Sequence, residues 1–178
     1  KDGSNFEDVK TDSYYYDSVK WANGLGITEG TDKTHFSPDA VCTRAQMVTF
    51  LWRMAGKPEA KLETCDFDDV DLDGYYGKAL LWALENGITN GTSASRFSPD
   101  AVITRGQMVS LLYRFGGSPE TAEQPVFEDV STEAYYYDAV IWAYATGITK
   151  GTTASAFDPD GGCTRAQIVT LMYRYSIR

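Results

Sequence analysis

The amino-acid sequence repeats itself three times, and this periodicity constrains the fold more than any other feature. An F-[ED]-D-V motif begins at Phe6, Phe67 and Phe127, with spacings of 61 and 60 residues. The same spacings relate W-A, G-I-T-x-G-T, F-[SD]-P-D and T-R-[AG]-Q-[MI]-V in each copy. Because a sequence repeat of this kind corresponds to one structural unit, we expect units over residues 1–59, 60–120 and 121–178.

Each repeat is predicted to contain two helices joined by a long loop. In the first repeat, residues 14–25 form the first helix, with Val19 and Ala22 on the buried face, and Gly26 ends it in a left-handed conformation. The second helix follows Thr43 and buries a V-x-x-L pattern. Pro38 in F-S-P-D indicates a turn between the helices, and residues 57–65 and 118–125 have the composition of linkers.

One helix pair is too small to bury its own apolar surface, so the repeats must share a core. An open stack would need terminal repeats with a polar outer face, but the first and third copies are as apolar as the second at matching positions. We therefore predict an all-α fold in which three helix-pair repeats close around a pseudo-threefold axis as one domain.

The T-R-[AG]-Q motif predicts a capping box at the start of each second helix. Threonine and glutamine at this spacing exchange hydrogen bonds with each other's backbone N–H groups, and loss of such a cap typically costs about 1 kcal/mol. The three predicted pairs are Thr43 with Gln46, Thr104 with Gln107, and Thr164 with Gln167.

Capping does not explain the arginine between these residues. Arg44, Arg105 and Arg165 stand at the first helical position, where the helix dipole disfavours a cation. One interpretation is that the guanidinium group and the free amide groups of the first turn bind an external carboxylate or phosphate. The other is an ion pair within the chain. The sequence leaves both open, and the candidate carboxylates are Asp8, Asp69, Asp129, Asp39, Asp100 and Asp160.

These motifs together resemble the S-layer homology domain family over essentially the whole chain. The resemblance implies a three-pronged helical spindle that attaches bacterial surface proteins non-covalently to secondary cell-wall polysaccharides, which carry pyruvylated amino sugars in some members. It implies ligand contacts by Arg44, Arg105 and Arg165 in grooves between repeats. This chain has Gln where the family usually has an acid after the arginine, Gly106 in place of alanine, and Gly161-Gly162 in place of Ala-Val.

The G-I-T-x-G-T loops are interpreted first as turns that need glycine and second as ligand contacts, since the resemblance places them near the grooves. The loop residues proposed as ligand contacts are Gly30, Thr31, Gly91, Thr92, Gly151 and Thr152. Tryptophans and tyrosine pairs are assigned mainly to packing. An acidic segment from Asp69 lacks the final glutamate of a calcium loop, because Leu80 stands there.

Charge and composition narrow the choice of partner. The net charge of −9 and pI of about 4.5 argue against nucleic acid, which is bound through clustered cations. They favour a polymer recognised locally through an isolated acid group over a densely phosphorylated one. No apolar stretch is long enough to cross a membrane. Three cysteines include two predicted to be buried, Cys42 and Cys163, and a Cys42–Cys65 bridge stays open.

We therefore expect a non-catalytic, extracellular module that holds a larger surface protein to an anionic cell-wall polysaccharide, with no cofactor and no metal. The sequence shows no nucleophile and base pair and no nucleotide-binding glycine loop that would indicate an enzyme. The alternative is a protein–protein assembly or spacer domain of a surface protein.

Overall fold

The computed structural model describes residues 6–121 and 127–178, and within these ranges the chain forms six α-helices and isolated β-bridges. Part of the predicted linker at 118–125 lies outside the described residues. The helices are α1 (Tyr16–Gly24), α2 (Arg44–Met54), α3 (Gly77–Glu85), α4 (Arg105–Phe115), α5 (Tyr137–Ala145) and α6 (Arg165–Ser176).

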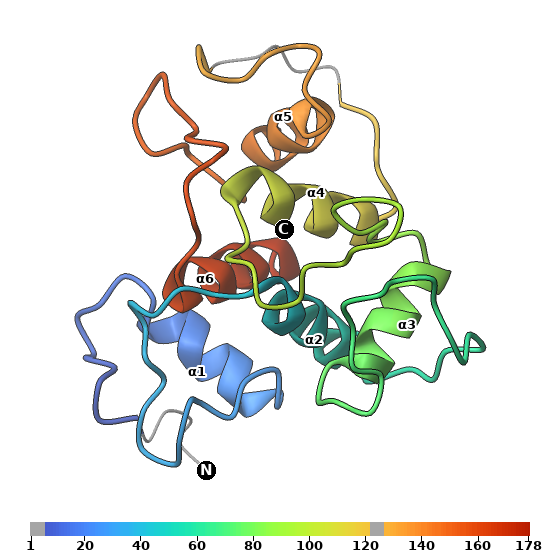
Figure 1. Cartoon of the computed structure of the whole chain (residues 1–178). Coiled ribbons are helices and arrows are strands. Elements are labelled where there is room, and N and C mark those ends of the chain that lie inside the picture. The colour runs from blue at the N-terminus through green and yellow to red at the C-terminus, as the bar shows by residue number, and fades with distance from the viewer. Residues whose placement is uncertain (1–5, 122–126) are drawn as a thin grey trace.

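The second helices of the three repeats lie at the centre and the first helices lie around them (Figure 1). Helix α2 packs on α3, α4 packs on α5, and α6 packs on α1. Each outer helix therefore packs against a central helix of the preceding repeat, and the contact between α6 and α1 closes the ring. The predicted all-α, closed arrangement of three helix-pair repeats is confirmed, and the helices that pack together come from neighbouring repeats.

The ends of the helices follow the predicted signals closely. Helix α1 ends just before Gly26, whose φ is +69°, and Gly87 and Gly147 take the same left-handed conformation. The outer helices begin later than predicted, because α1 starts at Tyr16 after a turn in which the Tyr16 N–H donates to the Ser13 carbonyl (3.0 Å). All three central helices have the predicted capping box, with both hydrogen bonds present in each.

The buried core contains the apolar positions expected from the repeat pattern. Val19, Ala22, Val48 and Leu51 are fully buried, as are their counterparts in the other two repeats. Trp82 and Trp142 are also buried, which agrees with their assignment to packing.

The aspartate of F-x-D-V holds the loop that precedes each central helix. The two carboxylate oxygens of Asp8 accept hydrogen bonds from the N–H groups of Phe36 (2.9 Å) and Ser37 (2.7 Å). Asp69 and Asp129 make the same pair of bonds in their own repeats. Ser37 has a φ of +57°, which is uncommon for a residue other than glycine, and the carboxylate stabilises this conformation before Pro38. The motif therefore repeats because every repeat contains this turn.

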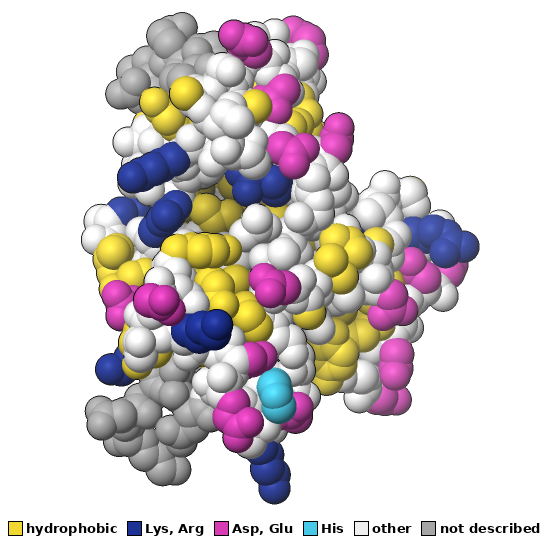
Figure 2. All heavy atoms as spheres, turned by 90° about the vertical axis from the view of Figure 1, so that its left-hand side faces the viewer, with side chains coloured by type: hydrophobic (Ala, Val, Ile, Leu, Met, Phe, Trp, Pro, Cys, Tyr) yellow, Lys and Arg dark blue, Asp and Glu magenta, His cyan; other side chains and the backbone are white. Residues whose placement is uncertain are grey.

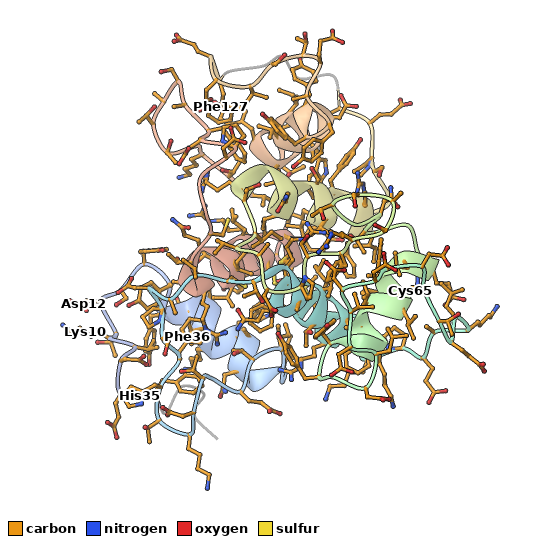
Figure 3. All side chains as sticks on the ribbon, in the orientation of Figure 1. Lys10, Asp12, His35, Phe36, Cys65 and Phe127 are labelled. Carbon is orange, nitrogen blue, oxygen red and sulfur yellow. The ribbon has the colours of Figure 1, made fainter. Side chains whose placement is uncertain are left out.

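Three backbone segments meet around the pseudo-threefold axis and form a cyclic set of hydrogen bonds. The Cys42 N–H donates to the Cys163 carbonyl (2.9 Å), Cys163 to Ile103 (3.0 Å), and Ile103 back to Cys42 (2.9 Å). All three side chains are fully buried, as predicted for Cys42 and Cys163. The three cysteines are free thiols, so the Cys42–Cys65 bridge is absent, and Cys65 lies toward α3 (Figure 3).

Candidate ligand-binding grooves

The three arginines of the T-R-[AG]-Q motif are buried between repeats. Arg44, Arg105 and Arg165 are 4%, 8% and 3% exposed. Each Nε donates to the carbonyl oxygen of a phenylalanine in the next repeat around the ring. These bonds join Arg44 to Phe97 (2.8 Å), Arg105 to Phe157 (2.7 Å) and Arg165 to Phe36 (2.8 Å).

The same guanidinium groups lie over the phenylalanine rings whose carbonyls they bind. The distances from the guanidinium carbon to the ring centroid are 4.9 Å for Arg44, 4.7 Å for Arg105 and 4.9 Å for Arg165. Arg165 therefore closes the ring by binding Phe36, which points inward while the adjacent His35 lies at the outer edge (Figure 3). Burial lowers the pKa of Arg44 and Arg165 from the ordinary arginine value.

Of the two interpretations of these arginines, the internal ion pair is not what the described residues show. Among the described residues, no carboxylate oxygen lies within 4.0 Å of the three guanidinium groups. The reason is visible at Asp69, whose oxygens already accept the N–H groups of Phe97 and Ser98, so it acts on Arg44 only at longer range. The guanidinium group instead binds a carbonyl oxygen and an aromatic face.

The first-turn amide groups are not free for a ligand, contrary to the sequence-based expectation. The Arg44 N–H donates to the Ala101 carbonyl (3.0 Å) and the Ala45 N–H to the Pro99 carbonyl (3.0 Å), both in the second repeat. The Gln46 N–H donates to the Thr43 hydroxyl (3.2 Å). The other two central helices repeat these bonds. Any anion held here must therefore be bound by side chains.

A cavity of about 320 Å³ opens beside Arg44 at the junction of the repeats. Its wall is one face of α4, formed by Gln107, Ser110, Leu111 and Arg114, and the loop at residues 89–92 lies across from it. Tyr135 from the third repeat completes the lining. The Arg44 Nη2 atom is buried and has no hydrogen-bond partner, although Arg44 lines this cavity.

A second cavity of about 170 Å³ lies beside Arg105 and has an equivalent lining. It is formed by α6, by the loop at residues 149–151 and by Tyr14 of the first repeat, and Arg174 takes the place of Arg114. We call these two cavities the Arg44 groove and the Arg105 groove.

The third interface, around Arg165, uses its arginine differently. Arg165 Nη2 donates to the Thr28 hydroxyl (3.4 Å), so the atom equivalent to the unpartnered Nη2 of Arg44 has an internal acceptor. By position in the repeat, Glu29, Arg53 and Tyr75 belong to this interface.

The structure brings together only some of the predicted loop contacts. Gly91 and Thr92 line the Arg44 groove with the arginine, and Gly151 lines the Arg105 groove, whose lining does not include Thr152. Gly30 and Thr31 belong to the Arg165 interface. The glycine is required by the fold, because Gly30 has a φ of +86° and an added Cβ would lie 2.5 Å from the Phe6 ring.

Two groups of groove residues were missed from the sequence. The exposed tyrosine of each pair, such as Tyr135 (63% exposed), was assigned to packing, but Tyr135 and Tyr14 line the grooves. Partial burial raises the pKa of both. Arg114 and Arg174 were also missed, although a second arginine nine residues after the first recurs in every repeat. That recurrence, at the same position of each second helix, is the signal that identifies them.

Both grooves are lined by cations without any acidic residue. The Arg44 groove has Arg44 and Arg114, and the Arg105 groove has Arg105, Lys150 and Arg174. Figure 2, which views the side where α1 and α6 lie, shows Lys and Arg side chains beside a hydrophobic surface, while acidic side chains surround His35. In a chain with a net charge of −9, such local positive sites attract an anionic ligand.

Within residues 6–121 and 127–178, no three side chains of His, Cys, Asp or Glu are grouped to hold a metal ion. At the predicted acidic segment, an Asp71 carboxylate oxygen accepts the Asp73 N–H (3.1 Å) in a local turn. None of the helices in the described part of the chain is long and apolar enough to span a bilayer.

Comparison with known proteins finds several larger proteins that match this chain over most of its length. An endoglucanase of Bacillus sp. (strain KSM-635) is 31% identical over 95% of this chain and 19% of its own length. An S-layer protein of Bacillus thuringiensis subsp. finitimus is 29% identical over 93% of this chain and 20% of its own. A cellulosome-anchoring protein of Acetivibrio thermocellus is 25% identical over 93% of this chain and 39% of its own. The chain therefore spans less than half of each of these relatives.

A family description of the S-layer homology domain matches residues 5–48, 66–109 and 126–169, one match in each repeat. The three matched segments contain the F-x-D-V, W-A, G-I-T-x-G-T and T-R-[AG]-Q motifs, and with them the motif arginine and the glycine loop of each repeat. The chain therefore belongs to the S-layer homology domain family.

Proposed function

We propose that this chain is a non-catalytic anchoring module that holds a bacterial surface protein to an anionic secondary cell-wall polysaccharide through the grooves between its repeats. The observation that carries the proposal is that two cavities in an acidic chain are lined by arginine and lysine and by no carboxylate. Arginine presents several donors in a planar arrangement that suits a carboxylate or phosphate. A sugar bearing an acid group matches these cavities.

Within the Arg44 groove, each side chain has a separate role. The unpartnered Arg44 Nη2 donates to the acid group of the ligand, and its Nε bond to the Phe97 carbonyl holds the guanidinium group in position. Arg114 Nη1 is bound to the Ile88 carbonyl (3.4 Å), which leaves its other donors for the ligand. Tyr135 offers a ring face and a hydroxyl to the sugar. In the Arg105 groove the equivalent side chains are Arg105, whose Nε is bound to the Phe157 carbonyl, Arg174, whose Nη1 is bound to the Ile148 carbonyl, and Tyr14.

The relatives support a role at the cell surface. Those with the best coverage include proteins named for the S-layer and one named for anchoring the cellulosome, and the enzymes among them match only over a fraction of their length. We therefore propose that this chain is part of a larger surface protein and that it lies outside the cell, in the cell wall. The pyruvylated amino sugar is the ligand that the family resemblance implies.

The test is co-sedimentation of the purified chain with bacterial cell walls before and after chemical removal of their secondary polymers. We expect the chain to sediment with intact walls and to stay in solution with stripped walls. Equal sedimentation with stripped walls would contradict the proposal. A concentration-dependent oligomer in light scattering that ignores both wall samples would favour the assembly or spacer alternative.

Matched arginine variants separate binding from folding. Arg53, Arg114 and Arg174 each donate an Nη1 hydrogen to an isoleucine carbonyl, at 3.2, 3.4 and 3.2 Å, but only the last two line the two grooves. The variants R53Q, R114Q and R174Q lose equivalent internal bonds. We expect the R114Q/R174Q double variant to lose wall retention and R53Q to keep it. Equal wall retention by both variants would show that Arg114 and Arg174 do not contribute to binding.

A further inference from the structure

The three G-I-T-x-G-T loops have the same backbone geometry but carry three different charges at one position. The hydroxyl of the loop threonine accepts the glycine N–H two residues later, at 3.2, 3.4 and 3.1 Å in the three repeats. The glycines share φ values of +86°, +82° and +80°. Between this threonine and glycine stand Glu29, Asn90 and Lys150.

This position lies at the lining of the grooves. Asn90 lines the Arg44 groove and Lys150 lines the Arg105 groove. Because the three loops have the same Thr–Gly hydrogen bond and similar glycine φ values, Glu29 occupies the corresponding place at the Arg165 interface. All three side chains are exposed and make no side-chain hydrogen bond within residues 6–121 and 127–178, so folding does not require their identity.

Because this position is Glu29, Asn90 or Lys150, the three sites differ in net charge. The Arg105 groove has three cations, Arg105, Lys150 and Arg174, and the Arg44 groove has two, Arg44 and Arg114. At the Arg165 interface the carboxylate of Glu29 offsets one of the two arginines at the equivalent positions. The same interface has already used Arg165 Nη2 to bind the Thr28 hydroxyl. Two independent features therefore make this interface the least suited to an anion.

We propose that the residue between Thr and Gly in each G-I-T-x-G-T loop selects which grooves accept the acidic ligand. Lys150 makes the Arg105 groove the tighter site, Asn90 leaves the Arg44 groove as the weaker site, and Glu29 excludes the ligand from the Arg165 interface. This inference rests on the proposed function, since it assumes an anionic ligand in the grooves. It adds that the chain has two unequal sites despite its threefold repeat.

Charge changes at this position provide the test, because they alter an exposed side chain and leave the arginine bonds in place. An acidic oligosaccharide purified from the secondary wall polymer is titrated into the chain by calorimetry, which reports the number of sites and the affinity of each. We expect two unequal sites in the unmodified chain. K150E should weaken the tighter site about tenfold or more, since a repulsive charge replaces an attractive one near the ligand's acid group. N90K should strengthen the weaker site, and E29K should add a third.

The control is K33E, which makes the same charge change at an exposed lysine outside both groove linings. It should leave the number of sites and both affinities within about twofold, because long-range effects are screened by salt. Three equal sites in the unmodified chain, or an affinity in K150E no lower than in K33E, would overturn the inference. A chain that binds no oligosaccharide at all would contradict the proposed function instead, so the two failures are distinguishable.

Discussion

Replacement of Arg165 by alanine tests whether the arginines join the repeats. Arg165 donates from Nε to the Phe36 carbonyl at 2.8 Å and lies over the rings of Phe36 (4.9 Å) and Phe50 (5.6 Å). Since α1 and α6 are the first and last helices of the ring, this contact connects segments that are 129 residues apart in sequence. Its removal should therefore weaken the closure of the whole domain.

The magnitude follows from the bonds that are lost. A hydrogen bond that involves a charged group contributes about 1.5–3 kcal/mol, and the loss leaves the buried Phe36 carbonyl without its side-chain donor. A desolvated cation–π contact contributes up to about 2 kcal/mol. Allowing for non-additivity, we expect R165A to lower the free energy of unfolding by about 3 kcal/mol, which is a large part of the roughly 5–15 kcal/mol typical of a domain.

Urea unfolding followed by circular dichroism measures this change as a lower midpoint at an unchanged slope. The control is R96A, because Arg96 is exposed and its closest ion-pair distance, to Asp69, is 4.0 Å. Such a surface substitution should change the free energy of unfolding by less than about 0.5 kcal/mol. A loss below about 1 kcal/mol in R165A would refute the structural role. If the role holds, a triple alanine variant of all three motif arginines should unfold, and its loss of wall binding would not measure ligand contact.

Two further predictions concern the thiols and the histidine. Burial raises the pKa of Cys42 to about 12 and of Cys163 to about 11. A disulfide reagent at pH 8 should therefore modify only Cys65 in the folded chain and all three thiols in urea. Rapid modification of all three thiols before unfolding would contradict the buried placement of Cys42 and Cys163. The Asp32 carboxylate accepts a hydrogen bond from the His35 ring, which raises the pKa of His35. The contribution of this pair to stability is therefore present below the ordinary histidine pKa and is lost as pH rises through the raised value. NMR titration should find the pKa of His35 lower in D32N, and an unchanged value would exclude the contact.

Local signals in the sequence predict most of the secondary structure. The Thr43 to Gln46 capping box and the glycine at position 26 act within a few residues, so their geometry follows from local chemistry. Closure of the ring also followed from the repeat, because the end copies lack polar outer faces. Which helix packs on which did not follow, since an outer helix has the same apolar face whether its partner lies in its own repeat or in the preceding one.

The groove chemistry was harder to predict because its bonds join different repeats. The acceptor of Arg44 Nε is a carbonyl 53 residues away. Every residue has a backbone carbonyl, so the sequence does not show which one accepts this bond. The first-turn amide groups were expected to be free because their acceptors at Pro99 and Ala101 belong to the next repeat. The position of Arg44 at the helix start was predictable, but its burial required the arrangement of three repeats.

The most direct test of the central claim is an NMR titration that follows the side-chain N–H resonances of the arginines as an acidic oligosaccharide from the wall polymer is added. If the cation-lined grooves hold the polymer, the Arg44, Arg105, Arg114 and Arg174 resonances shift in proportion to occupancy while those of Arg53 and Arg165 stay in place. Saturable binding that leaves the four groove arginines unshifted would contradict the account, because the polymer would then be held elsewhere on the molecule.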